Sequence, residues 1–302
     1  MLEELNRIRY IYHYTSLDTL LAILENYRKD KEKNGLIFRA SNIYMVNDPK
    51  EMEVGYGIVK EYLKEYETTY IPKPYWLHEI ANSNEYEAIC KNNYFVGYKG
   101  FLTEPVIIPF IISFSAKRDY LPMWSLYGKT GLGVCLKFDA FRIIEAEYDG
   151  QIGFVAYDNK TGLKMMKESF SECYNWYLDE YKDKLDLLTI DKKVHEIGNL
   201  CLYMSPFIKY RDYKYEKEFR LTCYKHYGDD IINTLSLNEF INPKIYPVDK
   251  YIEVPIPVSS FKEVMLGPNM DKSIMAHIVK KELEECNIRV RVSESKISFR
   301  LK

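Results

Sequence analysis

The sequence predicts an α+β fold: a single domain over residues 1–302, with a central mixed or antiparallel β core and two mainly helical insertions at about 56–100 and 160–205. Short runs rich in aromatic and β-branched residues recur along the chain and are typical of strands. The first insertion is instead rich in Tyr, Glu and Lys with little periodicity. No internal repeat, low-complexity tract or obvious linker divides the chain, so one domain is expected.

The first predicted elements are a strand and a helix. Residues Arg7 to Tyr14 are mostly aromatic or β-branched, which predicts the strand. Thr15, with Asp18 three residues later, is typical of a capping box at the start of a helix. Leucines follow at helical spacing, and Gly35 is a suitable C-terminal cap. The segment "LIFRAS" after it predicts a second strand.

The remaining elements follow from the same signals. The segment "NIYMVNDPKEMEVGYG" predicts a polar loop, in which Asp48-Pro49 favours an extended or turn geometry. Further strands are predicted at "VIIPFIISFS", "GVCLKFD", "EFRLTCY", "YIEVPI" and "FKEVML", with a short helix at "LPMWSL" and a longer one from Ser273 to Cys286. The closing segments "NIRVRV" and "KISFRL" are expected to pair through the turn "SESK".

Composition restricts the classes of protein to consider. With 47% hydrophobic and 28% charged residues the chain can bury a sizeable core, and its net charge of −2 gives no global field for nucleic acid or an anionic membrane. The N-terminus has no secretory-signal pattern, and the longest apolar run is too short to span a bilayer. No Cys-x-x-Cys pair suggests zinc or a disulfide framework. We therefore expect a cytoplasmic protein with reduced thiols and no membrane partner.

Two glutamates flank Lys217 at the start of a predicted strand, in "YEKEFRLTCY". Residues two apart share a face of an extended chain, so Glu216, Glu218 and Arg220 lie on one face and Phe219 on the other. Alone, this pattern is typical of a half-buried strand with a solvated face. Together with the segments below, it predicts one wall of an active cleft.

Other polar groups stand in loops or at the ends of predicted strands. His13 precedes a helix N-terminus, whose free N–H groups favour an anionic or oxygen-rich ligand; the alternative is a histidine that caps the turn. Asn47, Asp48 and Glu51 form either a functional loop cluster or an Asx-turn beside a solvated glutamate. Tyr127 adjoins a glycine-bearing turn, where the backbone can approach a flat ligand closely.

Familiar motifs for metals and nucleotides are missing. The histidines are far apart, and none has a partner four residues on. There is no Gly-x-Gly-x-x-Gly, no phosphate-binding loop with Gly-Lys-Ser/Thr, and no Gly-x-Ser-x-Gly. Basic residues alternate with tyrosines over 209–220, which indicates either a local contact with nucleic acid or, more often, a strand edge protected by charge.

Five segments together resemble the signature blocks of a bacterial family catalogued as domain of unknown function 2971. They are "YHYTSLDTLLAIL", "LIFRASNIYMVNDPKE", "SFSAKRDYLPMWSLYG", "YEKEFRL" and "EVMLGPN". The resemblance touches most of the chain outside the two insertions. It brings no mechanism, because that family has no assigned function.

A more distant resemblance is to ADP-ribosyltransferases. One branch uses a first-strand histidine with a small hydroxyl residue, a tyrosine beside a glycine turn, and a glutamate that opens a later strand. His13 with Thr15, then Tyr127, then Glu218 follow that order. The other branch uses an arginine, a Ser-Thr-Ser strand and a Glu-x-Glu pair, to which Arg9, "SFS" and "EKE" correspond equally well.

This resemblance implies an ADP-ribosyltransferase-like fold and an enzyme that uses NAD as substrate without a metal. It implies a toxin or phage-defence effector that modifies a protein or nucleic-acid acceptor. Glu218 would be the essential carboxylate, held rigidly by its strand, with Glu216 nearer the acceptor as a base. Repulsion between the two is expected to raise one pKa. The residues expected to bind NAD are His13, Tyr14, Thr15, Asn47, Asp48, Glu51, Ser113, Tyr127 and Arg220.

Two other classes of function stay open at the level of sequence. A nucleic-acid-binding or metal-dependent nucleolytic effector would use residues 209–220, with Asp48, Glu51, Glu216 and Glu218 as Mg²⁺ ligands. A non-catalytic binding module would have kept only the fold.

Overall fold

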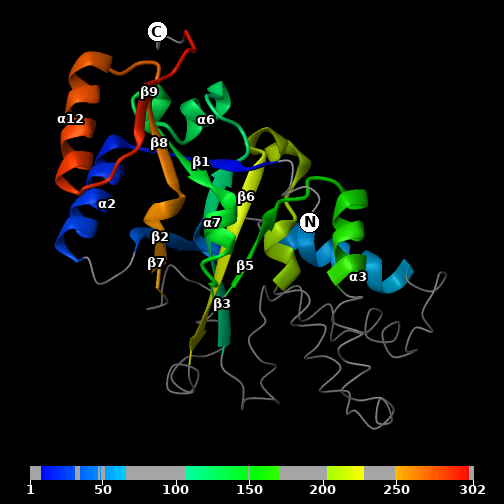
Figure 1. The fold of residues 1–302 in the computed structure, drawn as a ribbon. Helices are drawn as coiled ribbons and strands as arrows, with labels where there is room; N and C mark the ends of the chain where they lie inside the picture. The colour runs from blue at the N-terminus through cyan, green and yellow to red at the C-terminus, as the bar shows by residue number, and fades with distance from the viewer. Residues whose placement is uncertain are drawn as a thin grey trace.

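The computed structural model describes residues 8–30, 35–46, 48, 52–65, 106–148, 150–169, 203–227 and 249–298. In this part of the chain a nine-stranded sheet runs in the order β5-β6-β3-β1-β4-β8-β9, with β2 beside β3 and β7 beside β2 (Figure 1). The strands are β1 (Tyr10–Thr15), β2 (Leu36–Asn42), β3 (Val106–Ser115), β4 (Val134–Asp139), β5 (Gly150–Phe154), β6 (Glu218–Tyr227), β7 (Tyr251–Ile256), β8 (Phe261–Leu266) and β9 (Arg291–Glu294). The predicted α+β class with a mixed sheet is confirmed.

The sheet branches at β3. One edge of β3 pairs with β6 from end to end. Its other edge is divided: β1 meets it at Tyr12↔Ser115, and β2 meets it at Ser41↔Ile111 and the neighbouring pair. Between these contacts, residues 112–114 pair with neither β1 nor β2, so the sheet opens at this point.

Two helices, α2 (Leu17–Lys29) and α12 (Lys272–Glu285), lie side by side against the sheet (Figure 1). Ser16 caps α2, because its Oγ accepts a hydrogen bond of 3.0 Å from the N–H of Thr19. The two helices are joined by the Cys286 thiol, 3.4 Å from the carbonyl of Leu24. Together they cover the main hydrophobic core, which continues into the apolar side chains of the strands.

A second core lies beside β3. It contains one side of α3 (Glu53–Glu65), the 3-10 helix η2 (Ile43–Met45), a helix over residues 159–169 and the residues around η6 (Ser205–Phe207). The other short helices are α6 (Leu121–Leu126), η4 (Lys129–Gly131), α7 (Ala140–Ile144), η7 (Arg211–Glu216) and η8 (Val258–Ser260). The segment over 42–57, expected to be a loop, therefore contains η2 and the start of α3.

The ends of the first helix differ from the prediction. Thr15 is not its cap, because it is still part of β1 and pairs with Val134; the cap is Ser16. Gly35 is not its C-terminal cap either, because α2 ends at Lys29. Gly35 instead lies against β7, where a Cβ would come within 2.7 Å of the carbonyl oxygen of Ile256.

The described part of the closing segment differs from the predicted hairpin, and residues 299–301 lie outside the described residues. β9 pairs in parallel with β8, and residues 295–298 are not in a strand. Ser295 instead turns back, with its N–H bonded to the carbonyl of Leu266. β5 was not predicted at all, because its two glycines weaken the strand pattern.

Part of each expected insertion is described. α3 belongs to the first insertion and residues 159–169 begin the second; both are helical, while 66–105 and 170–202 lie outside the described residues. The assignment of the whole chain to one domain stays a prediction. Among the described helices, none combines the length and apolar character that a membrane span requires. The described cysteines, Cys135, Cys223 and Cys286, are buried.

Candidate functional site

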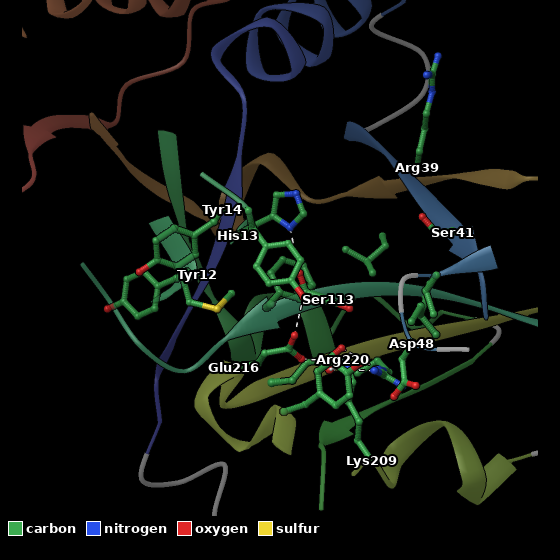
Figure 2. Close-up of a pocket in the computed structure, with 18 of the residues that line it drawn as sticks. Tyr12, His13, Tyr14, Arg39, Ser41, Asp48, Ser113, Lys209, Glu216 and Arg220 are labelled. Carbon is green, nitrogen blue, oxygen red and sulfur yellow. Dashed lines mark hydrogen bonds and ion pairs between the residues drawn. The ribbon is translucent and has the colours of Figure 1, made fainter. Parts of the chain in front are cut away.

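A cavity of about 320 Å³ lies where β1 and β2 separate along β3 (Figure 2). Backbone that pairs with neither neighbour leaves room for side chains from several elements to meet. The lining residues are Tyr12, His13, Tyr14, Arg39, Ser41, Met45, Val46, Asp48, Ile111, Ile112, Ser113, Phe114, Met123, Tyr127, Lys209, Tyr213, Glu216, Glu218 and Arg220.

Most of the predicted site residues line this one cavity. Thr15 does not, and Asn47 and Glu51 lie outside the described residues. The arginine required by the second ADP-ribosyltransferase pattern is also elsewhere: the Arg9 side chain is 68% exposed and lies 3.4 Å from Asp139. Neither pattern is therefore complete at the cavity, because Thr15 is absent from one and Arg9 from the other.

The two glutamates reach the cavity through a turn of the backbone. Glu216 ends η7, Lys217 has a left-handed conformation with φ of 46°, and Glu218 begins β6. The turn is held to β3, since the Ser115 hydroxyl donates to the carbonyl of Glu216 at 2.6 Å and the Ala116 N–H donates to that of Lys217 at 2.7 Å. Strand alternation alone would not have predicted this arrangement.

The face of β6 that carries Glu218 and Arg220 is not solvated, contrary to the usual expectation for such a pattern. Glu218 is 3% exposed and Arg220 is fully buried. Arg220 donates from Nε to Oε1 of Glu218 and from Nη2 to Oε2, both at 2.8 Å, and from Nη1 to the carbonyl of Pro206. The backbone N–H of Glu218 donates to the Tyr157 hydroxyl at 2.9 Å. The carboxylate therefore has one fixed orientation.

The ion pairs also decide the charge of Glu218. Burial would raise its pKa, but the positive charges of Arg220 and Lys209 outweigh that effect and hold the pKa at about 2. Glu218 is therefore ionised at any physiological pH. The expectation that repulsion raises the pKa of one glutamate is wrong for Glu218, because the charges of Arg220 and Lys209 lower its pKa.

Lys209 lies between the two glutamates. Its Nζ is 2.8 Å from Oε2 of Glu216, 3.5 Å from Oε2 of Glu218 and 4.5 Å from the ring centre of Tyr213. Because Lys209 and Arg220 are buried, the basic stretch 209–220 does not form one continuous surface. At the base of the cavity the positive charges of Lys209 and Arg220 balance the negative charges of Glu216 and Glu218.

Glu216 has a different environment from Glu218. Its Oε1 accepts a hydrogen bond of 2.5 Å from the Tyr127 hydroxyl, as the dashed line above Glu216 in Figure 2 indicates. Burial and the neighbouring Glu216 both raise the pKa of Tyr127, so the phenol keeps its proton and remains a donor. One oxygen of Glu216 therefore meets a neutral group, whereas both oxygens of Glu218 meet cations.

His13 projects from β1 at the opening of the sheet (Figure 2). Its Nδ1 is 3.0 Å from the carbonyl oxygen of Ser113, and because a carbonyl only accepts, Nδ1 carries the proton. Burial lowers the pKa of His13, which keeps the ring neutral. Nε2 is then an acceptor. His13 does not cap α2, so that alternative is excluded.

Some predicted features have structural roles instead. The Tyr14 hydroxyl is already used: it donates to the carbonyl of Lys117 at 2.8 Å and accepts from the N–H of Tyr120 at 3.1 Å. The glycine turn packs against protein rather than leaving room for a ligand. A Cβ at Gly133 would lie 2.2 Å from the carbonyl oxygen of Thr15, and Gly131 has a φ of 85° beside Pro268.

Sequence reasoning missed three residues that shape the site: Lys209, Tyr157 and Arg39. The signal for Lys209 was present, because a lysine follows a buried segment shortly before the glutamates, but it was assigned to a surface. Arg39 lines the cavity from β2, with its guanidinium 4.4 Å from the ring centre of Tyr251. Nothing in the sequence around Tyr157 indicates that its hydroxyl holds the backbone of Glu218.

The Mg²⁺ ligand set considered above is only partly described, because Glu51 lies outside the described residues. In the described ranges, no group of three or more His, Cys, Asp and Glu side chains is placed to hold a metal ion. The carboxylates of Glu216 and Glu218 are instead bonded to Lys209 and Arg220.

Comparison with known proteins gives a family match and no function. Residues 123–221, from α6 to β6, match the model of a family described as "Protein of unknown function (DUF2971)". The matched segment contains Tyr127, Lys209, both glutamates and Arg220. No curated protein and no solved structure matches the chain. The resemblance to ADP-ribosyltransferases therefore has no support from these comparisons.

Proposed function

We propose that the cavity binds NAD and cleaves the bond between nicotinamide and ribose, with transfer of ADP-ribose to an acceptor. One observation carries the proposal: His13, Tyr127 and Glu216, from distant parts of the chain, line the same cavity. Its volume of about 320 Å³ lies at the lower end of the range for small-molecule sites, which suits the nicotinamide and ribose end of NAD.

Three groups would bind the substrate. Nε2 of the neutral His13 is an acceptor for a ribose hydroxyl, and the Tyr127 ring offers a flat surface to nicotinamide. Arg39 would contact the pyrophosphate where NAD leaves the cavity, because its guanidinium is a cation on the cavity wall, positioned against the ring of Tyr251.

The chemistry requires a negative group near the ribose. When the bond from C1′ to the nicotinamide nitrogen breaks, its electron pair goes to the ring, and positive charge develops on the ribose as in glycoside hydrolysis. An acceptor oxygen or nitrogen then bonds to C1′ and releases its proton to a base. Glu216 can stabilise the developing charge and receive that proton, because one of its oxygens is bonded to Lys209 and the other to the neutral phenol of Tyr127.

Glu218 would have a supporting role in this proposal. Its two oxygens are bonded to Arg220, so its charge is largely offset before substrate arrives. It fixes Arg220 and, with Glu216, the position of Lys209. The structure thus gives a reason to assign the direct role to Glu216 rather than to Glu218, which the sequence favoured.

The test uses NAD labelled separately in its nicotinamide and adenine parts. We expect the purified protein to release labelled nicotinamide, and to transfer the adenine label to a component of cell extract or to water. Release of neither label under conditions where the protein is folded would contradict the proposal. Expression of an active enzyme is expected to stop growth, which fits a toxin or phage-defence effector.

A further inference from the structure

A second surface of the protein carries an excess of positive charge. It lies on one face of the sheet, on β4, β8 and β9, with Arg9 just before β1 and Arg118 in the loop after β3. The charged groups of this face, called the basic face below, are Arg9, Arg118, Lys137 and Arg291 with the carboxylates Asp139 and Glu263. Four cations therefore stand against two carboxylates.

The strand register places these groups next to one another. Lys137 of β4 is opposite Tyr12 on β1 and Glu263 on β8, and Glu263 is opposite Arg291 on β9. Partners in register share a face of the sheet, and adjacent strands are about 4.8 Å apart. This row therefore contains two cations, Lys137 on β4 and Arg291 on β9, on either side of Glu263.

The carboxylates lie beneath the cations. The side chains of Asp139 and Glu263 are 7% and 5% exposed, whereas those of Arg9 and Arg291 are 68% and 75% exposed. Glu263 is shared, at 2.8 Å from Arg118 and 3.8 Å from Arg291. Solvent and any partner thus meet the positive groups first.

Lys137 is held by an aromatic ring. Its Nζ lies 3.7 Å from the ring centre of Tyr10, and the guanidinium of Arg9 lies 5.3 Å from the same ring. The ring orients Lys137 without neutralising it, whereas Arg9 is also paired with Asp139. The arrangement combines fixed positive charge with aromatic groups, which is the combination that single-stranded nucleic acids bind.

The basic face leads to the cavity. Tyr12 lies two residues from Tyr10 on the same side of β1 and also lines the cavity. In the described part of the chain, none of the large apolar side chains that are exposed belongs to β1, β4, β8 or β9. The face is therefore poorly suited to insertion into a membrane or to an apolar protein partner.

We infer that the basic face binds single-stranded nucleic acid and presents it to the cavity as the acceptor of ADP-ribose. The binding part of this inference is independent of catalysis, and the acceptor part rests on the proposed function. This binding surface differs from the contact with nucleic acid that the sequence predicts over 209–220, because Lys209 and Arg220 are buried.

Binding to fluorescent single-stranded DNA and RNA oligonucleotides, measured by anisotropy over a range of salt, tests the inference. The triple variant Arg9→Gln, Lys137→Gln, Arg291→Gln removes three positive charges from the face. We expect at least tenfold weaker binding at low salt. The slope of log K against log salt should fall by roughly 0.7 for each lost phosphate contact, or about 2 in all.

The matched control removes three positive charges elsewhere, by Lys29→Gln, Lys160→Gln and Lys164→Gln, which are exposed and lie on α2 and on the helix over residues 159–169. It is expected to bind within twofold of the wild type. Equal weakening in both triple variants, or no binding by the wild type, would overturn the inference. So would tight binding of anionic lipid vesicles or polyglutamate with the same sensitivity to the first triple variant.

Nicotinamide release in the absence of acceptor separates the two proposals, because the basic face does not belong to the NAD-binding machinery. If the wild type cleaves NAD but does not bind oligonucleotides, the basic-face inference fails and the proposed function stands. If oligonucleotide binding depends on Arg9, Lys137 and Arg291 but NAD is not cleaved, the proposed function fails. The inference that the basic face binds nucleic acid then stands.

Discussion

Glu218 and Arg220, two residues apart on β6, face each other through two hydrogen bonds of 2.8 Å, from Nε to Oε1 and from Nη2 to Oε2. Both side chains are almost inaccessible to water. Removal of one member leaves the other charge buried without its partner, which is strongly destabilising. The pair is therefore part of the structure of the site as well as of its electrostatics.

The first prediction concerns stability. Glu218→Gln should lower the free energy of unfolding by about 3 kcal/mol or more, because the buried charge of Arg220 loses its counter-charge. Urea unfolding followed by circular dichroism measures the change. Glu145→Gln is the control: Glu145 is exposed and forms an exposed ion pair with nearby Arg142, so a change below about 0.5 kcal/mol is expected. Equal midpoints for the two variants would contradict the buried ion pair.

The second prediction concerns pH. The pKa of Glu218 is about 2 in the folded protein and near the ordinary 4.5 when unfolded. Its contribution to stability is therefore complete above pH 4.5 and is lost as the pH falls towards 2. The difference in unfolding free energy between wild type and Glu218→Gln should shrink over that window. A difference that stays constant from pH 6 to pH 3 would show that the carboxylate is not ion-paired.

The third prediction concerns the turn that directs the two glutamates. Lys217 has a φ of 46°, a conformation that glycine adopts freely and β-branched residues resist. Lys217→Gly should leave the unfolding free energy nearly unchanged, whereas Lys217→Val should reduce it by about 1–2 kcal/mol. Chemical denaturation of both variants provides the comparison. If the valine variant were as stable as the glycine variant, the turn would have to differ from the one described.

Much of the fold could be predicted from the sequence, because its strands and long helices are coded by local patterns. The alternating and aromatic runs identified most of the strands, and the leucine spacing identified α2. What could not be predicted depends on contacts between distant segments. The parallel pairing of β9 with β8 arises from α12 between them, and the signal at 291–301 is equally compatible with a hairpin.

The site could be predicted in part. His13, Tyr127 and the two glutamates were selected from their local surroundings, and all line the cavity. The sequence did not reveal how the charges of the two glutamates are offset. That depends on the contact of Lys209 with Glu216 across η7 and on the hydrogen bonds of Arg220 to Glu218. Because these contacts cannot be seen in the sequence, the sequence favoured Glu218 over Glu216 as the essential carboxylate.

The fourth prediction concerns Tyr127. Tyr127→Phe keeps the ring but removes the hydroxyl that donates to Glu216. We expect nicotinamide release to fall about tenfold, while the unfolding free energy changes by no more than about 1 kcal/mol. Tyr148→Phe is the control, since it removes a hydroxyl that donates to the carbonyl of Pro255 and does not line the cavity. Equal rates for the two variants would exclude a role of the Tyr127 hydroxyl in the reaction.

The central claim is that Glu216 acts on the substrate, and the rate of nicotinamide release by Glu216→Gln tests it most directly. Glutamine keeps the size of the side chain and can still accept a hydrogen bond from Tyr127, but it carries no charge. With wild type, Glu216→Gln and Glu145→Gln compared at equal concentrations of folded protein, we predict a rate roughly 10²–10³ lower for Glu216→Gln alone. A Glu216→Gln rate equal to that of the wild type would contradict the claim.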